Sequence, residues 1–194
     1  MKIELQEFLR EDGTSPYQEW FDGLDAQAAA KVATAEYRMS MGNTSNIKWF
    51  EGIGEYRIDW GPISITPRRY ATSTSGVSVR RRREVSEMAL TRDFKATIAA
   101  RVERDPAFAK AMLDEAVTLF LNGEPDTARL MLRDLVNATV GFEALAEDTG
   151  RPSKSLHRML SPTGNPGMDN LSAIIGAVRK ALKVNLEVHT ISAA

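Results

Sequence analysis

The stretch 142–160, FEALAEDTGRPSKSLHRML, constrains the fold of this chain more than any other. Both of its ends carry apolar residues at three- and four-residue spacings, which is typical of short helices that each bury one face. Gly150 stands between them, and glycine readily adopts the positive φ that ends a helix at a sharp turn. The sequence therefore predicts two short helices joined by a tight corner. The residues expected to be buried are Phe142, Leu145, Ala146, Leu156, Met159 and Leu160.

The second of these helices has a polar, basic outer side. Ser153 is expected to cap it, because a serine hydroxyl can accept a backbone N–H bond and Pro152 disfavours helix in the residue before it. Arg158 can bind guanine or phosphate through two hydrogen bonds, and Lys154 offers a compact positive charge. The pattern predicts a helix-turn-helix that binds DNA. A helical hairpin whose polar side is merely solvated is the alternative. The candidate DNA-binding residues are Ser153, Lys154, Ser155, His157 and Arg158.

A third helix is expected after the proline- and glycine-rich segment 161–167. Its apolar residues recur at helical spacing and can cover the exposed apolar side of the two-helix corner. The residues of this stripe are Leu171, Ile174, Ile175, Val178 and Leu182.

Composition excludes several kinds of site. The chain of 194 residues has no cysteine and two histidines, so a disulfide framework and a thiolate metal site are impossible and a zinc site is not expected. We expect no cofactor. The chain has no long apolar run, and its beginning lacks the apolar stretch of a signal peptide, so we expect a cytoplasmic protein without a membrane partner. The net charge of −1 excludes nucleic-acid binding over the whole surface but allows a local basic patch.

Residues 1–62 have a mixed helix and strand pattern. A strand is expected near the start, and Ser15-Pro16 opens a short helix that is expected to bury Trp20, Phe21 and Leu24. Asp25 caps a longer helix that ends near Met41, and a hairpin follows from Ile47. So few strands leave a sheet edge uncovered, and a part of this size buries too little surface to be comfortably stable.

Residues 63–87 are rich in Ser, Thr and Arg without a sustained apolar period, and we interpret them as a linker. The run Arg80–Arg83 is either a solvated segment or a nucleic-acid contact. One hypothesis for the origin of the linker is a frameshift that joined two reading frames.

From Met88 the pattern is helical. Thr91 is expected to cap a helix through Arg104, Asp105-Pro106 to open the next, and Glu124-Pro125 a third. The tail alternates apolar and polar residues from Val184, which predicts one strand that needs a partner, either in a second copy or in the N-terminal half. The fold class expected for the whole chain is α+β.

Residues 88–192 resemble a HigA-like antitoxin with a lambda-repressor-type helix-turn-helix. The likeness rests on the stretches MALTRDFK, RDPAFAKAMLDEA, RLMLRDLVNATVGFEALAEDTGRPSKSLHRML and GNPGMDNLSAIIGAV. Residues 1–61 resemble the front part of a HigB-like toxin of the RelE superfamily in EDGTSPYQEWFDGL and GIGEYRIDWGP, but the later strands and C-terminal helix of that family are missing. The resemblance implies domains at 1–62 and 88–194, with the linker between them and the helix-turn-helix at 142–160.

Three functions follow as expectations. The first is a DNA-binding antitoxin and autorepressor without catalytic residues, whose partners are operator DNA, a HigB/RelE-like toxin and a second copy of the chain. The alternative is a ribosome-dependent mRNA endoribonuclease in residues 1–62, where Lys48 and Arg57 could face RNA but no histidine is present. In the third, the toxin-like part is a permanent partner that occupies the toxin-binding surface of the antitoxin-like part.

Overall fold

The computed structural model describes residues 3–50, 53–58 and 90–190, which form a mixed α and β protein of two compact units, residues 1–111 and 112–194. The boundary between the units falls inside one helix, α4 (Pro106–Leu121). The expected domains at 1–62 and 88–194 stay a prediction. The linker 63–87, with Arg80–Arg83, lies outside the described residues.

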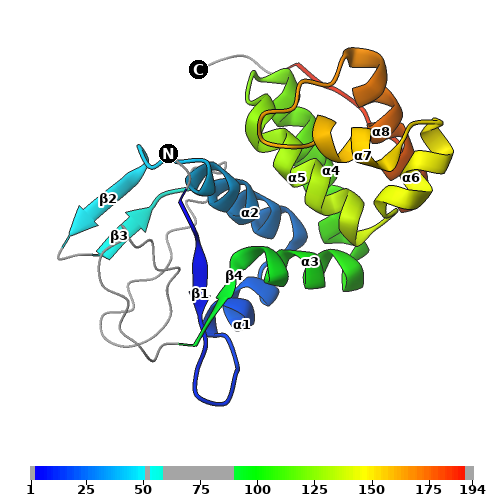
Figure 1. The fold of residues 1–194 in the computed structure, drawn as a ribbon. Coiled ribbons are helices and arrows are strands. Elements are labelled where there is room, and N and C mark those ends of the chain that lie inside the picture. Colours follow the sequence, from blue (N-terminus) through cyan, green and yellow to red (C-terminus); the bar gives the residue numbers. More distant parts are fainter. Residues whose placement is uncertain (1–2, 51–52, 59–89, 191–194) are drawn as a thin grey trace. The chain divides into compact units, whose positions relative to one another are not determined.

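The first unit draws its elements from both sides of residues 59–89. Strand β1 (Gln6–Phe8) pairs antiparallel with β4 (Thr91–Asp93), and the two lie side by side in Figure 1. A separate antiparallel hairpin is formed by β2 (Ile47–Phe50) and β3 (Ile53–Tyr56), as the sequence predicted. The edge of the first strand is thus covered by a strand that lies some 85 residues later in the chain.

Three helices begin directly after a residue whose side chain caps the helix N-terminus. Ser15 caps α1 (Pro16–Asp22) by accepting from Gln18 N at 3.0 Å, and Asp25 caps α2 (Ala26–Ser40) by accepting from Ala28 N at 2.8 Å. Asp105 does the same for α4. These three starts were predicted correctly.

Two expectations in this unit are wrong. Asp93, not Thr91, caps α3 (Phe94–Arg104), because its carboxylate accepts from Lys95 N at 2.9 Å while Thr91 belongs to β4. Trp20 is 38% exposed, although its ring lies 5.8 Å from that of the buried Tyr17, whereas Phe21 is fully buried. Neighbouring residues of a helix point only about 100° apart. A helix of seven residues is too short for its sequence pattern to show which of two neighbours faces the core.

The core of the first unit is built around α2. Its side chains are buried on most sides, and the alanines among them let neighbouring elements approach closely. The largest fully enclosed side chains of the unit are Leu5, Phe21, Tyr37, Phe94, Ile98 and Phe108.

The second unit is helical. After α4 come α5 (Pro125–Ala138), α6 (Phe142–Thr149), α7 (Ser153–Met159) and α8 (Met168–Leu182), shown from green to orange in Figure 1. Its core is made of the apolar stripes of these helices, and the predicted stripe of α8 is buried at Ile174 and Val178. The strand expected from Val184 is not formed, because the described residues 184–190 pair with no other strand.

Candidate nucleic-acid interface

The corner between α6 and α7 forms at Gly150, as predicted. Gly150 has φ +63 and ψ +25, in the left-handed region, and closes the last turn of α6. The next N–H, of Arg151, donates to Ala146 O at 3.2 Å, and the Thr149 hydroxyl donates to Leu145 O at 2.7 Å. These bonds satisfy carbonyls that the helix end would leave free. Helix α6 therefore ends at Thr149, and α7 begins at Ser153, three residues after Gly150.

The expectation that Ser153 caps α7 is wrong. The cap position is held by Pro152, whose carbonyl accepts from Ser155 N at 2.8 Å, and Ser153 is the first residue of the helix. The Ser153 hydroxyl instead donates to Glu143 Oε1 at 2.8 Å. Because Glu143 belongs to the first turn of α6, this bond ties the start of α7 to the start of α6.

The inner faces of the two helices hold the corner closed. Phe142, Leu145, Leu156 and Leu160 are buried, as the spacing predicted, whereas Ala146 and Met159 are half-buried. The His157 ring stacks on Phe142, with 3.6 Å between ring centroids and 17° between planes. His157 is therefore half-buried against α6, and less of its ring faces solvent than the sequence pattern indicated.

The exposed cations of α7 are Lys154 and Arg158, which lie one helical turn apart. Within the part of the chain that the structure describes, neither side chain forms a hydrogen bond or an ion pair. Ser155, between them, is half-buried. A free guanidinium and a free ammonium on one side of a helix can bind phosphate or base edges without first breaking an internal contact.

Two arginines of α5 hold α7 and the loop that follows it, and neither is among the residues predicted from the sequence. Arg133 Nη1 donates to His157 O at 3.1 Å, and the buried Arg129 donates to Ser161 O at 3.3 Å and Pro162 O at 3.1 Å. Arg129 also pairs with Asp126. The available signal was a pair of arginines four residues apart inside an apolar stripe, a place where a cation needs internal acceptors.

A hollow of about 300 Å³ lies beside Arg158. Its wall includes the loop after α7, where Gly164 approaches the end of that helix so closely that an added Cβ would lie 2.1 Å from Met159 O. The side-chain oxygen of Asn170, also in the wall, is buried without a partner among the described residues. The residues lining the hollow are Arg158, Met159, Thr163, Gly164, Asn165, Pro166 and Asn170.

The outer side of α6 is acidic, in contrast to that of α7. Glu143, Glu147 and Asp148 are exposed, and Asp148 lies 3.4 Å from Lys180 Nζ of α8. Because carboxylates repel anions, a negatively charged ligand is favoured on the α7 side of this corner.

The two residues considered for contact with RNA lie in the first unit. Lys48 and Arg57 are exposed, and Arg57 Nε lies 4.0 Å from Glu55. Tyr37 is fully buried and contacts Phe94 edge-on at 5.5 Å, so its hydroxyl is part of the core.

Comparisons of the chain with protein families, with curated proteins and with solved structures found no match. Among the described residues, no helix combines the length and the apolar character needed to cross a membrane.

Proposed function

We propose that this chain is a DNA-binding antitoxin and transcriptional autorepressor of a type II toxin–antitoxin module, fused to an incomplete toxin. The observation that supports the DNA-binding part most directly is the corner of α6 and α7, closed at Gly150 and carrying two unpaired cations, Lys154 and Arg158, on the outer side of α7. The antitoxin part of the proposal rests on the sequence resemblance of residues 88–192.

In this proposal α7 enters the major groove. Arg158 binds a guanine edge or a phosphate, Lys154 neutralises a phosphate, and Ser153, Ser155 and His157 border the contact. The bond from Arg133 to His157 O holds the C-terminal end of α7, and the bonds from Arg129 hold the loop that follows it. A backbone that is ordered before binding loses less conformational entropy when it binds.

The proposed DNA complex contains two copies of the chain. Helix-turn-helix proteins of this kind bind two half-sites about 34 Å apart, so a symmetric operator calls for a symmetric pair of reading helices. The other proposed partner is a HigB/RelE-like toxin. We propose no catalytic role for the first unit, because residues 1–61 lack the later strands and the C-terminal helix of the family that they resemble.

The proposal is tested by binding to the DNA upstream of the chain's own gene. Arg158→Ala is expected to weaken specific binding by about 1–3 kcal/mol and to relax the sequence preference at one position, because a base contact is lost. Lys154→Ala is expected to weaken binding to all sequences similarly and to lower the dependence of log K on log salt by about one unit. Footprints and titrations at several salt concentrations measure both effects.

Arg179→Ala is the matched control, because Arg179 is an exposed arginine of α8 whose guanidinium bonds to Asn185. It removes the same charge and is expected to leave the footprint and the sequence preference unchanged. If Arg158→Ala and Lys154→Ala also leave affinity and footprint unchanged, α7 is not the reading helix and the proposal fails.

A further inference from the structure

The first unit contains an interface between two segments that lie far apart in the chain. We call residues 3–40 the N-terminal segment and residues 90–108 the docking segment. Their backbones meet in the β1–β4 ladder, where Glu7 stands opposite Arg92 and Leu9 N donates to Leu90 O at 2.9 Å. A short ladder of this kind fixes the register between two chains as readily as within one.

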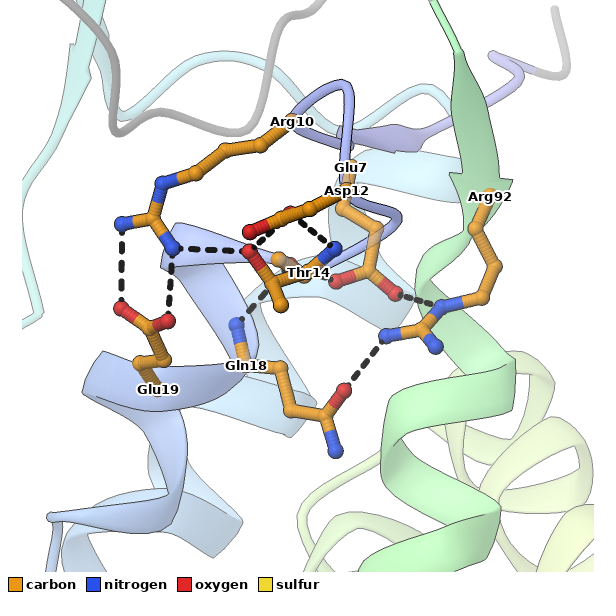
Figure 2. A network of polar contacts seen from close by, with 8 residues as sticks. Glu7, Arg10, Asp12, Thr14, Gln18, Glu19 and Arg92 are labelled. Carbon is orange, nitrogen blue, oxygen red and sulfur yellow. Dashed lines mark hydrogen bonds and ion pairs between the residues drawn. The ribbon is translucent and has the colours of Figure 1, made fainter.

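The ladder is reinforced by a buried carboxylate whose partners come from both segments. Glu7 is fully enclosed, and its oxygens accept from Ser15 Oγ at 2.5 Å, from Arg92 Nε at 2.6 Å and from Thr97 Oγ1 at 2.5 Å. Figure 2 shows Arg92 reaching from β4 to Glu7 and to Gln18 of α1, which it contacts at 2.8 Å. Burying a carboxylate is costly unless a cation and hydrogen bonds accompany it. The docking segment supplies the cation.

A second arginine of the docking segment binds the end of α1. Arg101 is buried, and its guanidinium donates to Phe21 O and to Leu24 O, the latter at 2.7 Å. The last carbonyls of a helix have no partner inside the helix and attract a cation. Arg104 forms a further ion pair with Asp22.

Two aromatic pairs complete the contact. Phe108 meets Phe21 edge-on, with 5.6 Å between ring centroids, and Phe94 meets Tyr37 in the same way at 5.5 Å. Buried aromatic and arginine side chains of this kind supply most of the binding energy in protein–protein interfaces.

We propose that the docking segment is a protein-binding surface, and that in the intact chain it is occupied by the N-terminal segment of the same chain. A competing protein must offer the same chemistry, namely a strand with a carboxylate opposite Arg92 and a helix that ends under Arg101. The inference rests on the proposed function in one respect, that this competitor is a free toxin. The fused chain then neutralises toxin poorly, because its own residues hold the surface.

The interface is tested in the full-length protein with a protease site inserted between Ser75 and Gly76. After cleavage, the two pieces are expected to stay together in gel filtration at micromolar concentration. Separation of the wild-type pieces would overturn the inference, whereas DNA binding measured on the same protein tests the proposed function independently.

Variants identify which contacts hold the pieces. Arg92→Ala leaves Glu7 buried without a cation, so the dissociation constant of the cleaved pieces is expected to rise by about tenfold or more. Thr97→Val removes two hydrogen bonds, the one that the hydroxyl donates to Glu7 and the one that it accepts from Arg92, but leaves the cation in place. It is expected to have a smaller effect in the same direction. Glu19→Gln breaks the exposed Arg10–Glu19 pair of the same unit and is expected to have no effect. Equal association in all four proteins would show that the Glu7 cluster does not hold the interface.

Occupancy of the surface is tested by exchange. Cleaved protein with a tag on its N-terminal piece is mixed with the uncleaved chain, and the tag is followed. Because the uncleaved chain holds its own N-terminal segment, the tagged piece is expected to remain with its original partner. Transfer of the tagged piece to the uncleaved wild-type chain would show that the surface is open and would overturn this part of the inference.

Discussion

Glu36 is a glutamate enclosed by the core of the first unit. It is 2% exposed, and neither of its carboxyl oxygens has a hydrogen-bonding partner among the described residues. Burial raises the pKa of Glu36 to about 8, the nearby Tyr17 hydroxyl lowers it in part, and the charge of Glu7 raises it further. The same environment raises the pKa of Tyr17, mainly through burial and then through Glu36. Glu36 is thus a protonated acid in the folded chain at neutral pH.

The raised pKa makes stability depend on pH. The folded chain holds the Glu36 proton up to about pH 8, whereas the unfolded chain releases it near 4.5, so unfolding releases a proton between these values. The contribution is fully present below the unfolded pKa and is lost as pH rises toward 8, at up to about 1.4 kcal/mol per pH unit. Glu36→Gln is expected to flatten this decline and to be more stable than the wild type at pH 8, as measured by urea unfolding at pH 5, 6.5 and 8.

Glu103→Gln is the control for the pH experiment, since Glu103 is exposed on α3. Its pH profile is expected to follow that of the wild type. A Glu36→Gln profile that declines as steeply as the other two would mean that Glu36 does not carry the proton that is released on unfolding.

At the scale of the element, the α6–α7 corner and the loop after α7 use glycine for different reasons. Gly150 needs positive φ but has open space where a Cβ would lie, whereas Gly164 lies against Met159 O and Arg158 O. Gly150→Ala is therefore expected to destabilise the chain by about 1–2 kcal/mol through backbone strain alone. Gly164→Ala is expected to cost about 3 kcal/mol or more, because backbone atoms have to move. Urea unfolding followed by far-UV circular dichroism gives both values.

The two glycine variants serve as controls for each other. Gly150→Asn is a further check, since asparagine tolerates the left-handed region better than alanine and is expected to lose less stability. A larger loss for Gly150→Ala than for Gly164→Ala would contradict the close approach of the loop to the end of α7.

At the scale of the whole molecule, the two compact units can be followed separately. Every tryptophan and tyrosine of the chain lies within the first 70 residues, so tryptophan fluorescence reports on the first unit and circular dichroism on both. Arg101→Ala removes the cation that binds two carbonyls at the end of α1 and packs against Phe21 and Phe108. We expect it to lower the free energy of unfolding of the first unit by about 3 kcal/mol, because each hydrogen bond from a charged group contributes about 1.5–3 kcal/mol.

For Arg101→Ala we expect the fluorescence transition at a lower denaturant concentration than in the wild type. Part of the helical circular dichroism signal is then lost only at higher denaturant concentration. Arg179 is an exposed arginine of the second unit. The variant Arg179→Ala is expected to leave the midpoint of the fluorescence transition unchanged. If fluorescence and helical signal of Arg101→Ala shift together over the whole transition, the two units unfold as one and the separate description of their stability is wrong.

Local sequence patterns were sufficient to predict many of the helix ends and buried faces of this protein. The caps at Ser15, Asp25 and Asp105, the end of α6 at Gly150 and the buried stripe of α8 follow from side chains acting on their own neighbours, so the amino-acid order alone determines them. The same holds for the exposed cations of α7, because the inward residues fix the direction of the others.

Which segments meet depends on contacts that form only in the folded chain. Nothing in residues 1–62 indicates that β1 pairs with a strand at Thr91–Asp93, or that Glu7 is neutralised by Arg92. The same is true of the bond from Ser153 to Glu143 and of the packing of the His157 ring on Phe142. Each of these contacts joins residues that meet only after the chain has folded, and the free energy of the Glu7–Arg92 contact also depends on the burial of Glu7.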